Sequence, residues 1–327
     1  MTTTDAFNPP HCGLIFTDEH IQKARANKDS PPFAPAWALL DVLEAQNDID
    51  AGLIDGWRYR LKDDIKAGER AAAGLLDSLP NAQQTESPVD GYRAFFALSQ
   101  MLELLRDVPT MARSDLWMVT YRDFLHALPV PPADDRIGTA WYGVAQMAAG
   151  VVLADEALFN ASVTIFKATV DDEIHPEGYF RTAVKVDPEI ASLTNQVLGV
   201  QALVLLAEMA AAAGYHEDLW AYENRGVSVI TSATYVLYYY FYPEQWRWNG
   251  DEYRPSAGVK LKSARALFGR HASFAEIIAR RYQKPLRAVS MIQRDLRPIF
   301  DPHGGGLVTL THAEPEPQPK RRRWFFF

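Results

Sequence analysis

Apolar side chains recur every three to four positions along most of this chain, and the positions between them are largely polar. The run that contains Trp37, Leu40 and Leu43 is one example. This spacing places apolar side chains on one face of an α-helix, whereas the strict alternation typical of half-buried strands is scarce. The pattern therefore predicts an all-α protein. The expected helices span residues 17–28, 36–46, 63–79, 89–106, 113–128, 139–153, 156–170, 189–213, 227–242, 274–282 and 285–294.

Two stretches interrupt the helical pattern. Residues 171–187 contain Pro176 and Gly178 and run into Pro188, so we expect an ordered loop there. Residues 246–258 form a second irregular stretch. In a ring of helices, such loops commonly shape one rim of the central cleft.

Small residues are dense in two of the expected helices, at 140–149 and 202–213. Alanine and glycine let neighbouring helix backbones approach closely, which suits an inner ring of helices. No repeat of fixed period is present, and antiparallel helix pairs joined by short turns would form either a toroid or an irregular bundle without one. The pattern of residues leaves both architectures open.

The end of the chain differs in composition from the rest. Residues 314–320 are rich in proline, and 321–327 read Arg-Arg-Arg-Trp-Phe-Phe-Phe. We therefore expect a single domain over residues 1–312 and a tail over 313–327. A basic and aromatic tip on such a tether can touch an anionic membrane surface or a partner, and a disordered end is the alternative.

The composition limits the classes of partner. The chain has 327 residues, of which 48% are hydrophobic and 23% charged, as in ordinary globular proteins. Its net charge of -8 provides no overall field that attracts a polyanion, so nucleic acid is not an expected partner. An acidic polysaccharide would meet the same repulsion, and its binding requires a local cluster of Arg and Lys inside a groove.

Cys12 is the single cysteine, so no intramolecular disulfide is possible. The first twelve residues lack a basic region followed by an apolar run, which predicts a cytoplasmic protein, or a periplasmic or secreted one if a signal was removed. No apolar run is long enough to predict a transmembrane segment. Metal-ligand spacing is absent around the acidic residues, and the glycines of 303–306, expected to be flexible, open no phosphate loop. We therefore expect no metal and no cofactor.

Three stretches resemble the alginate lyase family of polysaccharide lyases. They are His11 to Thr17 with Pro35 to Leu40; Trp141 through Met147, Val151-Val152 and Leu158-Phe159 to Glu177-Gly-Tyr-Phe180; and Thr194-Asn195 to Gly214 with Asp218 to Tyr222. A fainter similarity lies at Phe274 to Glu276, and the densest part covers residues 136–222. The resemblance implies an (α/α) toroid of antiparallel helix pairs that acts on acidic glycans.

The resemblance also implies a reaction. A uronate lyase removes the proton α to a carboxylate and expels the glycosidic oxygen, so the site must neutralise that carboxylate. In the family an Asn-Asn-His run and an Arg do this, and a Tyr exchanges the protons. The corresponding positions here hold Arg136-Ile137-Gly138, Val186 and Leu193, so all three roles are missing where the family places them.

Neighbouring residues can substitute for the missing groups. We expect Arg136 and Arg181 to bind the carboxylate and Tyr179 to act as the base, with Lys185 adding positive charge; Tyr142 and His175 are other possible bases. The alternative for Arg181 and Lys185 is that they are solvated loop charges, and for His175 a surface turn. The substrate-binding candidates named so far are Lys185 and Tyr142, with Trp141 beside them.

A second set of candidates surrounds an aromatic helix. Tyr235, Tyr238, Tyr239 and Tyr242 fall on one helix face, where they can form a sugar-stacking platform or simply core. Asn195 and Gln196 fall where the family carries Asn and Tyr, and their amides can bond sugar hydroxyls or form helix contacts instead. The remaining candidates near this helix are Arg225, Trp246 and Arg247.

These observations favour an alginate-lyase-like protein, a polysaccharide lyase that cleaves an acidic uronate glycan by β-elimination with an altered catalytic set. Its expected partner is an acidic polysaccharide or oligosaccharide. The alternative is a catalytically inactive helical toroid that binds a glycan or a protein.

Overall fold

The computed structural model describes residues 7–78, 87–112, 115–246, 248–249, 252–253, 258–282 and 287–316. The helices are α1 (Asp18–Ala26), α2 (Phe33–Val42), α3 (Asp48–Lys62), α4 (Ile65–Ser78), α5 (Pro88–Leu105), α6 (Pro109–Ala112), α7 (Leu116–Ala127), α8 (Arg136–Leu153), α9 (Glu156–Ala168), α10 (Glu189–Ala212), α11 (Val229–Phe241), α12 (Leu261–His271), α13 (Phe274–Arg281), α14 (Arg287–Leu296) and α15 (Val308–His312). The short strands β1 (Trp248–Asn249) and β2 (Glu252–Tyr253) pair as a small antiparallel hairpin. The predicted all-α fold is confirmed.

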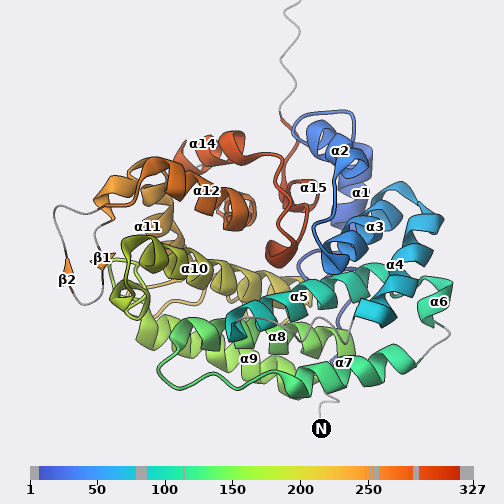
Figure 1. The fold of residues 1–327 in the computed structure, drawn as a ribbon, viewed down its shortest axis with the longest axis horizontal. Helices are drawn as coiled ribbons and strands as arrows, with labels where there is room; N and C mark the ends of the chain where they lie inside the picture. The colour runs from blue at the N-terminus through green and yellow to red at the C-terminus, as the bar shows by residue number, and fades with distance from the viewer. Residues whose placement is uncertain are drawn as a thin grey trace, which may run out of the picture.

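The helices follow one another around a ring (Figure 1). From α1 and α2 the chain passes through α3, α5 and α8 to α10, then through α11 and α12 to α14. It closes where α15 packs against α1, α2 and α13. Consecutive helices form pairs, as α8 and α9 do across the short link Ala154-Asp155.

The hydrophobic pattern missed the longer helices α3 and α12 and the short helices α6 and α15. Helix α3 contains Gly52 and Gly56, which weaken the intrinsic preference for helix. They lie where α5 comes closest, because a Cβ at Gly52 would be 2.1 Å from the Met101 sulfur and one at Gly56 would be 3.2 Å from Leu104 Cβ. Packing against α5 therefore stabilises a helix that its own sequence favours weakly.

Helix α10 runs through the middle of the ring and is buried along most of its length. Among the described residues it is the one helix that is both long and apolar enough to cross a bilayer by those criteria. Its most apolar window is 78% buried within the protein, as in a core helix.

A buried carboxylate joins the two ends of the ring. Glu208 on α10, 1% exposed, accepts two hydrogen bonds from Arg281 of α13, at 2.6 and 2.7 Å, and one from His312 of α15 at 3.3 Å. The indole of Trp220 donates a further bond of 3.0 Å. The ring of His312 in turn packs on His20 of α1, with centroids 5.6 Å apart. Glu208 thus connects the inner helix to both the first and the last helix.

The packed chain extends past the predicted domain boundary at residue 312. Ala313 is buried, Glu314 forms an ion pair of 2.5 Å with Lys23, and the backbone N–H of Glu316 donates to Pro31 at 3.2 Å. The tail from residue 317 onward lies outside the described residues.

Removing the Glu208 carboxylate should destabilise the protein strongly. Burial by itself would raise the pKa of Glu208, but hydrogen bonds from His312 and Arg281 and their charges lower it to about 2. Glu208→Ala leaves these partners without their anion, and we expect the free energy of unfolding to fall by about 3 kcal/mol in urea denaturation. The control is Glu217→Ala, which removes an exposed pair with Lys167 and should change the midpoint little. Similar losses in both variants would contradict the role of Glu208 in closing the ring.

The stability should also depend on pH through His20. Burial, followed by the charges of His312 and Arg280, lowers the pKa of His20 from 6.5 to about 3. Between these values the unfolded chain binds a proton that the folded chain does not, so the free energy of unfolding falls as the pH decreases. We expect His20→Asn to reduce this slope by up to about 1.4 kcal/mol per pH unit in denaturation at a series of pH values. His126→Asn, at an exposed position on α7, is the control, and an equal change there would refute the assignment.

Candidate functional site

The candidate site lies where α8 and α10 begin. Residues 173–185, named here the rim segment, run from the short helical turn Thr169–Glu173 to the turn Ala183–Lys185, shortly before α10. Asp135 caps α8, its carboxylate accepting the N–H of Gly138 at 2.7 Å. The first residue of that helix, Arg136, is exposed.

Hydrogen bonds from α10 and α11 hold the rim segment in place. The side-chain oxygen of Gln196 accepts the N–H of Phe180 at 2.8 Å, and its amide nitrogen donates to the carbonyl of Gly178 at 3.2 Å. Ser232 donates to the same carbonyl at 2.8 Å. Gly178 has a φ of +107°, and a Cβ there would be 2.6 Å from the Cβ of Tyr235. The bend therefore requires glycine.

Gly199 brings the two arginines to the same rim. A Cβ on Gly199 would be 2.9 Å from both Ile137 Cδ1 and Phe180 Cζ, so the start of α8 and the rim segment meet on α10 at this residue. Arg136 and Arg181 are the next residues along the chain from these two contacts. The close packing thus places both guanidinium groups in one region.

Both arginines act on the buried carboxylate of Glu173. This carboxylate accepts the backbone N–H of Thr182 at 2.6 Å and its hydroxyl at 2.5 Å. Burial raises the pKa of Glu173, while the bonds from Thr182 and the charges of Arg136 and Arg181 oppose that rise. Both arginines are exposed, and neither forms an ion pair with any residue that the structure describes. They remain available to an anionic ligand.

Aromatic side chains extend the site toward α11. His175 stacks on Tyr179 with ring centroids 4.3 Å apart, and Tyr179 contacts Tyr235 at 5.9 Å and Trp248 at 5.2 Å. The hydroxyl of Tyr235 accepts bonds from the Trp248 indole and the Tyr239 hydroxyl, both at 3.3 Å. Burial raises the pKa of Tyr179 and of Tyr235, so both phenols are protonated at neutral pH.

The structure thus groups many of the predicted site residues. Those exposed or half-buried on or beside the rim segment are Arg136, Tyr179, Arg181, Lys185, Asn195, Tyr235 and Tyr239. The side chain of Asn195 forms no hydrogen bond within the described part of the chain, so its amide is free for a ligand. Tyr142 is half-buried on the α5 side of α8, where it meets Tyr92 edge to face at 5.5 Å.

Other predicted contacts do not fit the structure. Trp141 and Trp246 are fully buried, and the Trp141 indole donates to the carbonyl of Leu198 at 3.0 Å. Gln196 is 0% exposed, and its amide holds the rim segment. The guanidinium of Arg225 donates to backbone carbonyls after α9, including that of Val170 at 3.3 Å, and so stabilises the local backbone. Arg247 lies outside the described residues.

No sequence pattern pointed to a further polar group at the same end of the inner helices. Arg93 of α5 lies with its guanidinium 5.4 Å from the ring centroid of Trp141 and bonds the imidazole of His271 at 3.0 Å. These residues come from helices far apart in the chain, and neither belongs to a recognisable motif. The predicted flexibility of the glycines at 304–306 is also wrong, since all three are buried.

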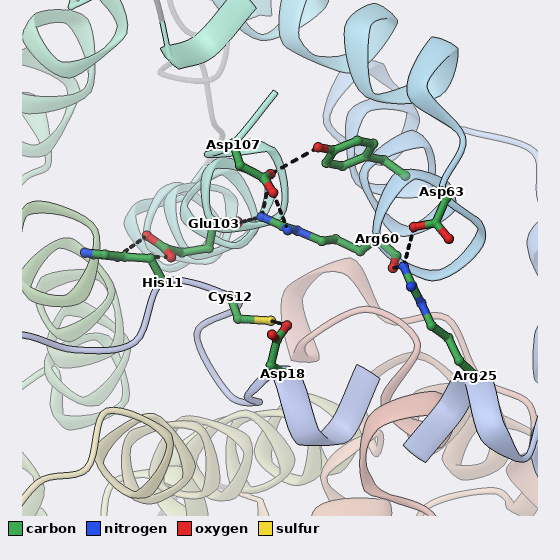
Figure 2. Close-up of polar contacts among 9 residues, drawn as sticks. His11, Cys12, Asp18, Arg25, Arg60, Asp63, Glu103 and Asp107 are labelled. Atoms are coloured by element: carbon green, nitrogen blue, oxygen red, sulfur yellow. Dashed lines mark hydrogen bonds and ion pairs between the residues drawn. The ribbon is translucent and has the colours of Figure 1, made fainter. Parts of the chain in front are cut away.

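A second polar region lies at the opposite end of α5, beside a cavity of about 630 Å³. Figure 2 shows that its charged groups face one another. Arg60 bonds Asp107 at 2.9 Å, and the buried Glu103 binds both His11 at 3.3 Å and Arg106 at 2.8 Å. Burial raises the pKa of the Cys12 thiol to about 12, so it is not a thiolate at neutral pH. The pair of His11 with Glu103 anchors the segment before α1 to α5, and the pair of Arg60 with Asp107 joins α3 to the end of α5.

Comparisons with known proteins give the same family as the sequence motifs. A family model described as alginate lyase matches residues 61–246, more than half of the chain. The alginate lyase A1-III complexed with a tetrasaccharide superposes with a TM-score of 0.71 at 16% identity, covering 96% of this chain and 98% of that one. An alginate lyase from Bacteroides ovatus gives a TM-score of 0.62 at 12% identity, covering 92% and 99%. At these identities the structures show the fold alone, and no curated protein matches the chain.

The docking of the rim segment can be tested at two neighbouring amides. Gln196→Ala leaves the N–H of Phe180 without its partner and removes one of the two donors to the carbonyl of Gly178, and we expect the free energy of unfolding to fall by about 1–3 kcal/mol. Hydrogen exchange should also become faster over residues 178–182. Asn195→Ala, one position away, should leave both properties nearly unchanged. Equal effects in the two variants would show that Gln196 does not hold the segment.

Proposed function

Because this chain belongs to the alginate lyase family, we propose that it binds a uronate-containing oligosaccharide at the rim segment and cleaves it by β-elimination. The observation that carries this proposal is the pair of exposed residues Arg136 and Arg181, whose charges both act on Glu173 and whose chain neighbours Ile137 and Phe180 pack together at Gly199. A protein with a net charge of -8 needs such a local concentration of positive charge to hold an acidic sugar.

The two arginines supply what the reaction requires first. The proton at C5 of a uronate is α to the carboxylate and becomes acidic only when that carboxylate is neutralised. A guanidinium can bind both carboxylate oxygens in parallel, which gives charge neutralisation and orientation together. The free amide of Asn195 is placed to bond a sugar hydroxyl or the same carboxylate.

Tyr179 is the candidate for proton transfer. Its phenolate would take the C5 proton while the bond between C4 and the glycosidic oxygen breaks. The phenol so formed would then give that proton to the leaving oxygen, which regenerates the phenolate. The product carries a carbon–carbon double bond conjugated with the carboxylate and absorbs ultraviolet light.

Stacking would position the sugar. Tyr235 and Tyr239 are half-buried, Tyr235 contacts Tyr179, and the ring centroids of Tyr235 and Tyr239 are 5.2 Å apart. Pyranose rings present C–H faces to aromatic rings, and the phenol hydroxyls can bond the sugar edge.

The residues that stand at the family's catalytic positions are also compatible with a second function, glycan binding without cleavage. Leu193, in place of the catalytic Tyr, is fully buried, and Val186, in place of the Arg, is half-buried and apolar. Burial also raises the pKa of Tyr179, which disfavours the phenolate. A glycan-binding protein without turnover would show these same features, and it predicts binding with no unsaturated product.

Cleavage of uronate polymers, followed by ultraviolet absorbance, tests the proposal. Because a base acts when deprotonated and the pKa of Tyr179 lies above its ordinary value of 10.0, we expect the rate to rise with pH into the alkaline range. Tyr179→Phe should lower kcat at least about 100-fold while the oligosaccharide still binds. The replacements Arg136→Gln and Arg181→Gln should each weaken binding about tenfold. Arg122→Gln, at an exposed position on α7, is the control.

The outcomes separate the two functions. Tetrasaccharide binding that Arg136→Gln weakens, with no product from any uronate polymer at any pH, would favour the binding protein. Absence of binding to every uronate oligomer would exclude both.

A further inference from the structure

Arg93, on the second turn of α5, has an unusual environment for a guanidinium. The residue is 7% exposed, donates to the imidazole of His271 at 3.0 Å, and forms an ion pair of 3.3 Å with Asp90, whose side chain is 54% exposed. Its buried Nε–H has no hydrogen-bond partner among the described residues. A buried cation with a free donor and one solvent-exposed counter-ion has bonding capacity left for an anion.

His303 is held near this cation by a locked turn. Asp301, 1% exposed, accepts bonds from the Gln201 amide at 2.7 Å, the Ser273 hydroxyl at 2.9 Å and the backbone N–H of His303 at 3.1 Å. These bonds tie the turn to α10 and to the link between α12 and α13. The imidazole of His303 is half-buried and makes no hydrogen bond within the part of the chain that the structure describes.

The charges around these two imidazoles keep them neutral. Burial, then the charge of Arg93, lowers the pKa of His271 and of His303 to about 3. The other charged groups that act on them are Arg270 and His303, which lower the pKa of His271, and Asp90, which raises the pKa of both imidazoles. Burial raises the pKa of the fully buried Asp301, and the nearby charge of Arg93 opposes that rise.

This group adjoins the rim segment through α8. Ile137 meets the rim segment at Gly199, and Trp141, against which Arg93 packs, lies one turn further along the same helix. Residues four apart share a helix face and are separated by about 6 Å along the axis. The two positive regions are therefore neighbours on the inner ring.

We propose that Arg93, His271 and His303 form a second carboxylate subsite for the acidic oligosaccharide, and that its occupation is coupled to proton uptake by the two imidazoles. This inference rests on the proposed function. The incoming carboxylate offsets the charge of Arg93, which removes one reason for the imidazoles to stay neutral. Protonated imidazoles then donate to the bound anion, so binding and protonation favour each other.

Calorimetric titration with an alginate tetrasaccharide tests the coupling. Measurements at about pH 5 in two buffers of different ionisation enthalpy give the number of protons taken up on binding. We expect net uptake by the unmodified protein, and loss of that uptake with affinity about tenfold weaker in Arg93→Gln. His303→Gln should reduce the uptake. Arg136→Gln should weaken binding yet leave the uptake unchanged, since it belongs to the rim segment.

Asp90→Asn distinguishes a subsite from a structural cluster. This exposed carboxylate competes with the ligand for Arg93, so its removal should tighten tetrasaccharide binding, the opposite of what structural damage would do. A neutral tetrasaccharide of glucose is the control ligand and should show no uptake. Thermal unfolding of each variant checks that it is folded.

The results separate this inference from the proposed function. Tetrasaccharide binding without proton uptake would contradict the second subsite and leave the rim site unaffected. The same holds if Asp90→Asn does not tighten binding while His303→Gln keeps the full uptake. If the tetrasaccharide does not bind to the unmodified protein, the proposed function is wrong and the subsite falls with it.

Discussion

The architecture of this protein depends on the buried carboxylate of Glu208. An ionised group inside a protein is costly unless it is paired and hydrogen-bonded, and here the partners come from α13, α15 and the segment after α10. Since His312 also packs on His20 of α1, the same anion brings the first and last helices together. Closing the ring in this way keeps the beginnings of α5, α8 and α10 at one end of the molecule, where the candidate site forms.

Close approach between backbones then shapes the site. At Gly199 and Gly178 a side chain would collide with neighbouring residues, so these two glycines let the rim segment lie directly on α10 and α11. The buried amide of Gln196 and the hydroxyl of Ser232 hold the segment, together with its own bridge between Ile174 and Phe180. The exposed residues Arg181 and Lys185 therefore stand on an anchored backbone, which is a favourable arrangement for positioning charged groups against a ligand.

The candidate site is distinguished from the rest of the protein by its positive charge. The protein as a whole is acidic, yet the exposed cations Arg136 and Arg181 and the buried cation Arg93 lie at one end of the inner ring. Burial keeps the phenols of Tyr179 and Tyr235 protonated and the imidazoles of His271 and His303 neutral. In the proposed function these groups recognise an anionic sugar, and proton transfer by them requires a change in their protonation.

Local patterns of residues were enough to predict several of the helices. Regular apolar spacing located 89–106 and 189–213 within about a residue of α5 and α10, and the motif resemblance indicated both the family and the region of Arg136, Arg181 and Asn195. The apolar spacing did not predict α3, because Gly52 and Gly56 weaken its helical pattern and this helix is stabilised by packing against α5.

The roles of the polar residues, in contrast, depend on how the helices pack together. Gln196 and Asn195 are adjacent and chemically similar. The amide of Gln196 is hydrogen-bonded to the rim segment, whereas the side-chain amide of Asn195 forms no such bond. Arg93 and His271 lie 178 positions apart and become partners only when the ring closes. Helical periodicity depends on neighbours three or four residues away along the chain. Burial, pairing and protonation depend instead on distances in space, and no local sequence pattern encodes those distances.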